Sequence, residues 1–180
     1  VDAVVIGAEL TSMEQHEEEW RKVSAAVREV YPNGLLTYAS NREISQEFPW
    51  DAVDFIGVDA FFALSVSADA TVEEMIFELE KDLLGIRADA AKLGMPLVFT
   101  EVGTTSQRGS FQRSWVWDHE SATDLEAQAR YYEAVCQVWK DELQGLYWWV
   151  TGLYQIPDDQ LSDDGYFDPM GKPAEAVIRS

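Results

Sequence analysis

The sequence predicts an α/β fold in which helices wrap a parallel sheet. Five short apolar runs alternate with longer stretches in which apolar residues recur every three or four positions. This alternation is typical of strand–helix units. The apolar runs are nearly continuous instead of alternating with polar residues. Such runs indicate strands that are buried on both faces, as in parallel sheets.

The five predicted strands follow one another along most of the chain. They are VVIGAEL (4–10), LLTYASN (35–41), FIGVDAFF (55–62), PLVFTEVG (96–103) and LYWWV (146–150). The connection SNREISQEFPWDAVD, between the second and third strands, is short. It has room for one helical turn but not for a full helix.

Three predicted helices fill the longer connections, at 17–32, 71–93 and 123–143. The last two begin with a Ser/Thr-x-x-Glu capping box, formed by Thr71 with Glu74 and by Thr123 with Glu126. Gly94 follows the second helix, and a glycine at that place is typical of a helix end. Because no Gly/Ser linker, low-complexity tract or internal repeat interrupts the pattern, residues 1–180 are predicted to form a single domain.

The chain is strongly acidic and poor in metal-binding residue types. It has 33 Asp plus Glu against 13 Lys plus Arg, a net charge of −20 that repels phosphate backbones and anionic membrane surfaces. We therefore expect neither a nucleic-acid partner nor a membrane partner. His16 and His119 are the only histidines and Cys136 is the only cysteine. A structural metal site is not expected, and no intramolecular disulfide can form.

The ends of the sequence carry no recognisable targeting signal. No apolar run reaches the roughly 18 residues that a membrane-spanning helix needs. The opening residues, VDAVVIGAEL, include neither an initiator methionine nor a basic signal-peptide region. We expect the N-terminus to be cut, with any targeting segment missing, so the sequence predicts no compartment.

Polar side chains stand at the carboxyl ends of four predicted strands: Glu9, Asn41, Asp59 and Glu101. Active sites of parallel α/β barrels are built at that end. For any single carboxylate, capping of the next helix is an equally good interpretation. Two glutamates in equivalent positions favour hydrolysis of a glycosidic bond, which takes one carboxylic acid to protonate the leaving oxygen and one carboxylate to attack or to activate water.

Aromatic residues gather near the same strand ends: Phe61, Phe62, Trp148, Trp149 and Tyr154. Sugar rings have apolar C–H faces that stack on aromatic rings, so these residues fit a carbohydrate ligand. Packing in the core is the alternative for each of them. Trp115 and Trp117 lie in the long loop after Glu101, where the sequence fits a substrate-facing wall and surface packing equally well.

Several sequence blocks resemble glycoside hydrolase family 113. They are IGAEL, LTYASN, DFIGVDAFFAL, PLVFTEVGTTS, DLEAQARYYEA, GLYWWV and GKPAEAV, in the order of that family's strand 4 to strand 8 blocks, over about residues 4 to 178. The resemblance implies a (β/α)8 TIM-barrel type of fold. It also implies that this chain is a partial barrel, the C-terminal part of a glycosidase barrel with about the last five strand–helix units.

The resemblance also implies an activity, that of an endo-β-1,4-mannanase or a related enzyme on β-linked mannose polysaccharides. It implies a retaining double displacement without a cofactor, with Glu9 as acid/base and Glu101 as nucleophile. The substrate is expected to contact the residues Asn41, Asp59, Phe61, Trp148 and Trp149. Trp149 is preferred to Trp148 as the stacking platform, because alternation along a strand lets only one of them face the barrel interior.

Two positions differ from the family pattern. Ala8 replaces the Asn that many members of the clan use to hold the substrate 2-hydroxyl. Phe61 replaces a Tyr whose hydroxyl would hydrogen-bond the nucleophile and help to keep it ionised. These differences favour an alternative, a truncated or decayed barrel that acts as a non-catalytic carbohydrate-binding or scaffold protein. A transglycosidase shares the covalent intermediate and is a third reading.

Five strands cannot close an eight-stranded barrel, and the first of them is predicted to be an exposed edge. Exposed edge strands and an uncovered apolar face favour association. We therefore expect self-association, or a complementary N-terminal barrel fragment as partner. The resemblance implies that arginines near the site, which the clan supplies from its early strands, would come from the N-terminal barrel fragment.

Overall fold

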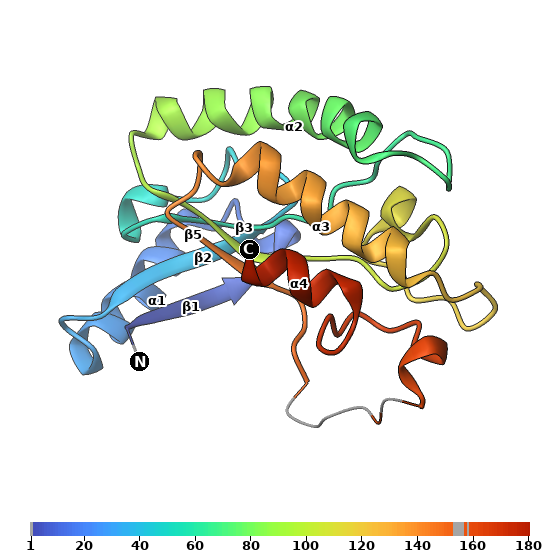
Figure 1. Cartoon of the computed structure of the whole chain (residues 1–180). Coiled ribbons are helices and arrows are strands. Elements are labelled where there is room, and N and C mark those ends of the chain that lie inside the picture. Colours follow the sequence, from blue (N-terminus) through green and yellow to red (C-terminus); the bar gives the residue numbers. More distant parts are fainter. Residues whose placement is uncertain (1, 153–156, 158) are drawn as a thin grey trace. The chain divides into compact units, whose positions relative to one another are not determined.

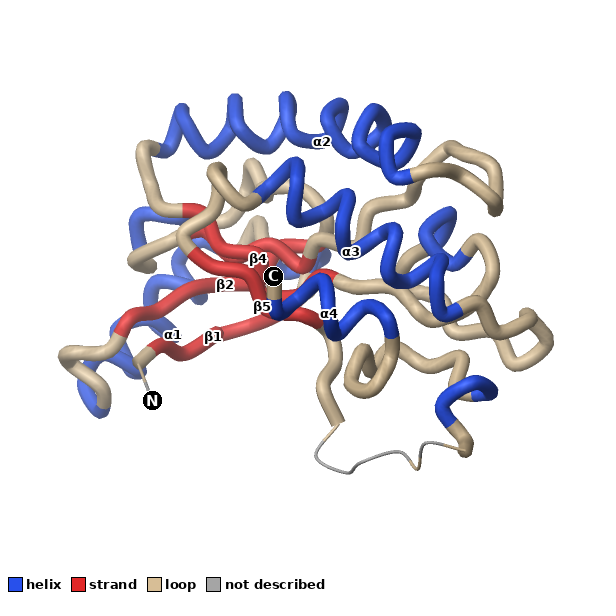
Figure 2. Tube along the Cα trace, in the orientation of Figure 1, coloured by secondary structure: helices blue, strands red, loops and turns tan. Residues whose placement is uncertain are grey.

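The computed structural model of the chain describes residues 2–152, 157 and 159–180. It contains a five-stranded sheet in the order β1-β2-β3-β4-β5 (Figures 1 and 2). The strands are β1 (Ala3–Ala8), β2 (Leu35–Asn41), β3 (Ile56–Asp59), β4 (Leu97–Val102) and β5 (Gly145–Trp148). β1 and β5 are the edges of this sheet, so the sheet is open.

The pairings from β1 through β4 are parallel, as the sequence predicts. Across β2 and β3, Asn41 is the register partner of Asp59. Across β3 and β4, Asp59 is the partner of Glu101, just past an irregularity in the register. The polar residues near the ends of these strands therefore lie together at the carboxyl-terminal end of the sheet.

The helices alternate with the strands. They are α1 (Glu17–Val30), α2 (Val72–Leu93), α3 (Leu125–Trp139) and α4 (Pro173–Arg179), and the 3-10 turns are η1 (Thr11–Met13), η2 (Trp50–Ala52), η3 (Ser110–Arg113) and η4 (Leu161–Asp163). The first three helices were predicted, and η2 is the single turn expected between β2 and β3. The sequence pattern gave no sign of α4, because seven residues are too few to establish a helical period.

One of the two predicted capping boxes is present. The Thr71 backbone N–H donates to the Glu74 carboxylate at 2.9 Å, and the Glu74 N–H donates to the Thr71 hydroxyl at 3.3 Å. The prediction for Thr123 is wrong, because the cap of α3 is Asp124, whose carboxylate accepts from the Ala127 N–H at 2.9 Å. An ionised carboxylate is the stronger acceptor for a helix N-terminus.

Four strands end earlier than their predicted runs, and β4 does so by one residue, at Val102. β1 ends at Ala8, before Glu9 takes a left-handed backbone conformation with φ 53°. β3 ends at Asp59, although the apolar run continues to Phe62, and β5 ends at Trp148. After β3 the chain leaves the sheet, so apolar residues there pack in irregular structure and do not extend the strand.

The residues group into two compact units. The first contains Val1–Ala60, Gly85–Glu101 and Leu143–Tyr147, and the second contains Phe61–Leu84, Val102–Glu142 and Trp148–Ser180. The first unit thus carries the sheet together with α1. The second carries α3 and α4, which pack against each other.

The core of the first unit is an aromatic cluster around a buried carboxylate. The Tyr38 ring stacks on Phe48 with centroids 4.4 Å apart, and the Trp20 ring lies 5.1 Å from Tyr38. Beside them Glu14 is only 6% exposed. It accepts hydrogen bonds from the Tyr38 hydroxyl at 2.8 Å and the Ser45 hydroxyl at 2.7 Å. These bonds satisfy the buried carboxylate and tie η1 to β2.

The second unit is built around α3. The Trp139 ring stacks on Phe62 with centroids 5.8 Å apart, and Tyr132 stacks on Trp148 at 4.0 Å. Among the described residues no helix is long and apolar enough to cross a membrane.

Candidate functional site

The candidate site consists of three carboxylates in the first unit. Glu101 lies within β4, Asp59 is the last residue of β3, and their Cα atoms are register partners. Glu9 follows β1 directly. All three come from the carboxyl-terminal parts of parallel strands, as the sequence predicts.

The backbone around Glu9 is held in an unusual conformation. Its N–H donates to the Ala39 carbonyl in β2 at 2.9 Å, and its φ is 53°. Left-handed backbone costs an L-residue with a Cβ about 1 kcal/mol relative to the right-handed region. Glycine would avoid this cost, and Arg42 is the other described residue with a side chain that has a positive φ, at 61°.

Asp59 is the most deeply buried of the three, with 1% of its surface exposed. Its carboxylate accepts a hydrogen bond from the Thr100 hydroxyl at 2.6 Å. Next to it, the Ala60 N–H donates to the Glu101 carbonyl at 2.6 Å. Thr100 was not singled out from the sequence. The signal available was a hydroxyl residue next to Glu101 in an otherwise apolar strand.

Burial and neighbouring negative charges raise the pKa values of Glu101 and Asp59. Burial raises the pKa of Glu101 to about 7, and the negative charges of Asp59 and Glu9 add to the rise. Burial raises the pKa of Asp59 to about 6, against the lowering effect of the Thr100 hydrogen bond, and the charge of Glu9 raises it further. The structure therefore brings Glu9, Asp59 and Glu101 into one group, in which the pKa values of Asp59 and Glu101 lie closer to neutral pH than those of free carboxyl groups.

This arrangement has the chemical groups for acid–base and nucleophilic work on a sugar. Carboxyl groups with pKa values near the working pH both donate and accept protons efficiently. A nucleophile, however, must be ionised, and the raised pKa of Glu101 works against that. No positively charged side chain is among the groups that shift the pKa of Glu101.

The predicted substrate-binding residues lie in two different settings. Asn41 ends β2, and its amide oxygen accepts from the Arg42 guanidinium at 3.1 Å. Phe61 is only 7% exposed, with its ring 6.5 Å from that of Phe167. A ring so deeply buried contributes to packing and has little surface left for a sugar.

The two tryptophans of β5 and its end also differ. Trp148 has one face covered by the stacked ring of Tyr132. Trp149 is 40% exposed, and its N–H donates to the Val102 carbonyl at 2.8 Å. Its peptide bond to Val150 is cis. Tyr154, also noted from the sequence, lies outside the described residues. Trp149 thus keeps more free ring surface than Trp148.

Among the described residues, no group of three or more His, Cys, Asp or Glu side chains is arranged to hold a metal ion. Glu9, Asp59 and Glu101 are included in that statement.

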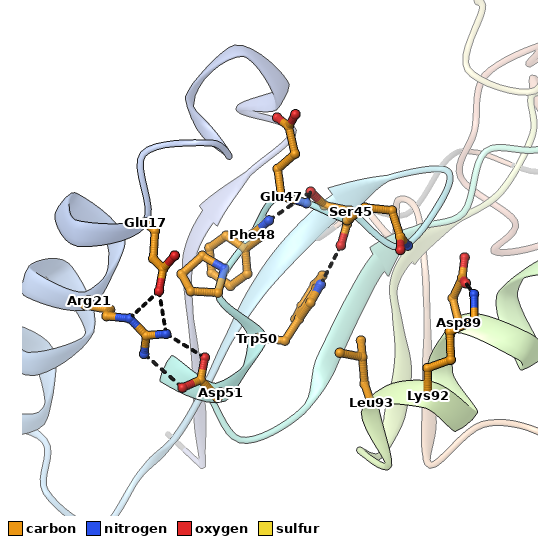
Figure 3. A pocket seen from close by; sticks show the side chains of 12 residues that line it. Glu17, Arg21, Ser45, Glu47, Phe48, Trp50, Asp51, Asp89, Lys92 and Leu93 are labelled. Carbon is orange, nitrogen blue, oxygen red and sulfur yellow. Dashed lines mark hydrogen bonds and ion pairs between the residues drawn. The ribbon is translucent and has the colours of Figure 1, made fainter.

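Two cavities lie in the first unit. One, of about 670 Å³, is lined by residues from β1, β2, β4 and β5 and from the segment before β3, including Val5, Val98 and Tyr147. The other, of about 370 Å³, lies beside η2 and is drawn in Figure 3. In it Arg21 hydrogen-bonds both Glu17 and Asp51. Because the Arg21 guanidinium is already bound by these two carboxylates, we assign no ligand to the smaller cavity.

The model of Glycoside Hydrolase Family 113 matches residues 1–172 of the chain. Two solved structures of family members are similar to it. A GH113 beta-1,4-mannanase solved as a complex is 27% identical, with a TM-score of 0.86. The GH113 beta-mannanase of Alicyclobacillus acidocaldarius, in complex with ManMIm, is 34% identical, with a TM-score of 0.81. Each alignment covers 99% of this chain but only 54% of the solved chain.

More distant structures share the fold alone. A glycoside hydrolase family 17 beta-1,3-glucanosyltransferase from Rhizomucor miehei is 19% identical, with a TM-score of 0.60, over 93% of this chain and 59% of its own. No curated protein sequence matches the chain. The predicted fold class is confirmed: the open sheet of parallel strands alternating with helices matches part of a (β/α)8 barrel.

Proposed function

The chain belongs to glycoside hydrolase family 113, and from this membership we propose that it acts on β-1,4-linked mannose polysaccharides by a retaining mechanism. The observation that carries the proposal is the placement of Glu9, Asp59 and Glu101 at the carboxyl-terminal ends of strands of one sheet, with Asp59 and Glu101 as register partners. A retaining glycosidase needs two neighbouring carboxyl groups. The solved mannanases are similar along nearly the whole of this chain, which supports mannan as substrate.

In the proposed mechanism Glu101 attacks the anomeric carbon and forms a glycosyl ester. Glu9 gives its proton to the oxygen of the leaving sugar as the glycosidic bond breaks. Glu9 then takes a proton from water, whose oxygen attacks the anomeric carbon and releases Glu101. Asp59 and Asn41 lie at the same sheet edge and are proposed to contact substrate hydroxyls. Trp149 is the proposed stacking platform, because 40% of it is exposed.

A trapping experiment tests this proposal. The chain is incubated with 2-deoxy-2-fluoro-mannosyl fluoride, which forms the glycosyl ester readily but hydrolyses slowly, and its peptides are mapped by mass spectrometry. We expect one added fluoromannosyl group, on Glu101. A label on another carboxylate would contradict the assigned roles. An unlabelled chain that still binds mannan would favour the non-catalytic alternative.

Specific observations favour that alternative as a second candidate function, a non-catalytic carbohydrate-binding or scaffold protein. The chain spans about half the length of the solved mannanases. The residues that depart from the family pattern, Ala8 and Phe61, remove two groups that would serve the reaction. In addition, the raised pKa of Glu101 disfavours the ionised form.

We also propose that a further chain segment or a second copy covers the open side of the sheet. The large cavity lies there, and its lining includes apolar side chains that are unusually exposed for strand residues. Val5 is 46% exposed, Leu35 50% and Tyr147 65%. In a closed barrel such inward-facing residues are packed in layers. A further segment with three strand–helix units would supply these layers. A second copy of the chain is the alternative cover for this face.

Light scattering across a salt series tests the covering of this face. If the chain is alone in solution, we expect self-association at micromolar concentration that tightens as salt rises to about 0.5 M, because salt screens the repulsion between copies that each carry −20. Val5→Lys should weaken association about tenfold or more, since it places a charge in the apolar contact. Val23→Lys, on α1 and 39% exposed, adds the same charge elsewhere and is the control. A monomer at all salt concentrations, with β1 protected from amide hydrogen exchange, would contradict the proposal.

A further inference from the structure

An exposed aromatic surface lies in the second unit, in the loop between η3 and α3 and the segment before α4. It consists of Trp117, His119 and Tyr166, and we call it the aromatic platform. The ring centroids of Trp117 and His119 are 4.1 Å apart, and those of Trp117 and Tyr166 are 5.2 Å apart with the rings near perpendicular, at 84°. Despite these contacts Trp117 is 45% exposed and Tyr166 is 36% exposed.

The platform is the exposed end of a continuous run of rings. Tyr166 meets the edge of Phe167 at 5.5 Å, and Phe167 in turn meets Phe61 at 6.5 Å. Phe167 and Phe61 are almost fully buried. Trp117 therefore rests on packed aromatic residues that fix its position.

The loop that carries Trp117 is also tied down by hydrogen bonds. The Gln107 side-chain amide donates to the Asp118 carbonyl, and its oxygen accepts from the Asp118 N–H at 3.2 Å. The Asp118 carboxylate accepts from the Glu120 N–H and from the Ser121 hydroxyl, both at 3.0 Å. These bonds hold the pKa of Asp118 below its usual range, and the bond from the Glu120 N–H has the larger effect. The Asp118 carboxylate that anchors the loop is therefore ionised at neutral pH.

The segment that carries Tyr166 is anchored from the buried side. The Tyr166 carbonyl accepts from the Ser106 hydroxyl at 2.7 Å and from the Lys172 ammonium at 3.0 Å. Lys172 is 3% exposed and also pairs with Asp164 at 2.9 Å. A surface whose rings are fixed before binding loses little entropy when a ligand stacks on it.

We propose that Trp117 and Tyr166 form a stacking surface that binds a neutral β-linked polysaccharide. Exposed aromatic rings offer stacking surface to the C–H faces of sugars. Exposed carboxylates nearby in the chain, Glu120 and Asp163, accept hydrogen bonds from sugar hydroxyls. The net charge of −20 repels an anionic ligand, so a neutral one fits this chain better. The choice of β-mannan as the polysaccharide rests on the proposed function.

Affinity measurements on soluble galactomannan and glucomannan test the platform. Every protein carries Glu101→Gln, so the polymer stays intact. Relative to that reference, Trp117→Ala should raise the Kd about tenfold, the effect of losing one good aromatic stacking contact. The Kd of the Trp117→Phe variant should lie between the values of the reference protein and the Trp117→Ala variant. Trp115→Ala removes a tryptophan of similar exposure, 43%, from the same loop and should change the Kd less than about twofold.

A second measurement avoids reliance on a variant's folding. In NMR spectra, the indole N–H signal of Trp117 is assigned as the one that is missing from the Trp117→Phe spectrum. Titration of the reference protein with mannohexaose should shift this signal. An unmoved Trp117 signal, no binding of either polymer, or equal affinities of the Trp117→Ala and reference proteins would overturn the proposal. Trapping at Glu101 uses a single sugar and so reports on the reaction separately. If Glu101 is labelled but Trp117 does not contribute to binding, the proposed function is retained and the platform is rejected. If polysaccharide binding depends on Trp117 but Glu101 is not labelled, the platform is retained and the proposed catalytic function is rejected.

Discussion

Glu101→Gln is expected to lower kcat on β-1,4-mannan about 10⁴-fold, because the amide cannot attack the anomeric carbon and no other group replaces the lost nucleophile. The change keeps the size and shape of the side chain, and Glu101 is only partly buried. Folding should therefore be preserved. The measurement is release of reducing ends, compared with Glu18→Gln, which removes one carboxylate from the exposed face of α1 and should keep full activity.

Thermal melts of the same variants separate loss of chemistry from loss of structure. The folded-state pKa of Glu101 is raised above its unfolded value, so the folded chain binds the extra proton. That contribution to stability is fully present below the unfolded pKa of about 4.5 and is lost as pH rises through about 7. Glu101→Gln should consequently match the unmodified chain or exceed it in Tm at pH 8. A large drop in Tm at that pH would show that the carboxylate is structural.

The pH profile of the unmodified chain gives a further readout of the same group. Only ionised Glu101 is nucleophilic, and burial raises its pKa to about 7. We therefore expect kcat/KM to fall as pH drops below about 7. If a further segment supplies arginines near the site, as the clan's early strands do, the acidic limb should move to lower pH in the completed assembly. Undiminished kcat/KM at pH 5 in the isolated chain would contradict the role of Glu101 as nucleophile.

The sequence predicted the strands well because a buried parallel strand is apolar throughout. The bounds of β2, Leu35–Asn41, agree with its run at both ends. β3 was predicted too long, since Phe61 and Phe62 continue the apolar run but pack as core after the strand has ended. An apolar run records burial and not hydrogen bonding, so it marks where a strand lies better than where it stops.

The grouping of Glu9 with Glu101 could be predicted because the carboxyl ends of parallel strands meet at one edge. The raised pKa of Glu101 could not, because it depends on how deeply each carboxylate is buried and on the position of Asp59 across the register. Trp117 was noted from the sequence as fitting a substrate-facing wall or surface packing, but its contact with Tyr166 could not be predicted. Trp117 and Tyr166 are far apart in the chain, and neither belongs to a helix or strand whose period would place them together.

Glu9→Ala is expected to lose activity in a way that depends on the leaving group. On mannan, whose leaving sugar needs a proton, kcat/KM should fall about 10³-fold, the usual contribution of a general acid. On a 2,4-dinitrophenyl β-mannobioside the phenolate leaves unprotonated, so kcat/KM should fall less than about tenfold. Initial rates on both substrates, with Glu18→Ala as the matched surface control, measure this difference.

The second half-reaction distinguishes a proton-transfer role from a general loss of structure. Without Glu9 no base activates water, so on the dinitrophenyl substrate the glycosyl ester at Glu101 should accumulate and appear as a burst of released phenol. Azide needs no base. Added azide should restore turnover and give a β-mannosyl azide, because it attacks from the face that Glu9 would have served. Equal losses on both substrates, without a burst and without azide rescue, would mean that Glu9 only maintains the sheet edge. The left-handed backbone at position 9 would then have to be explained by packing alone.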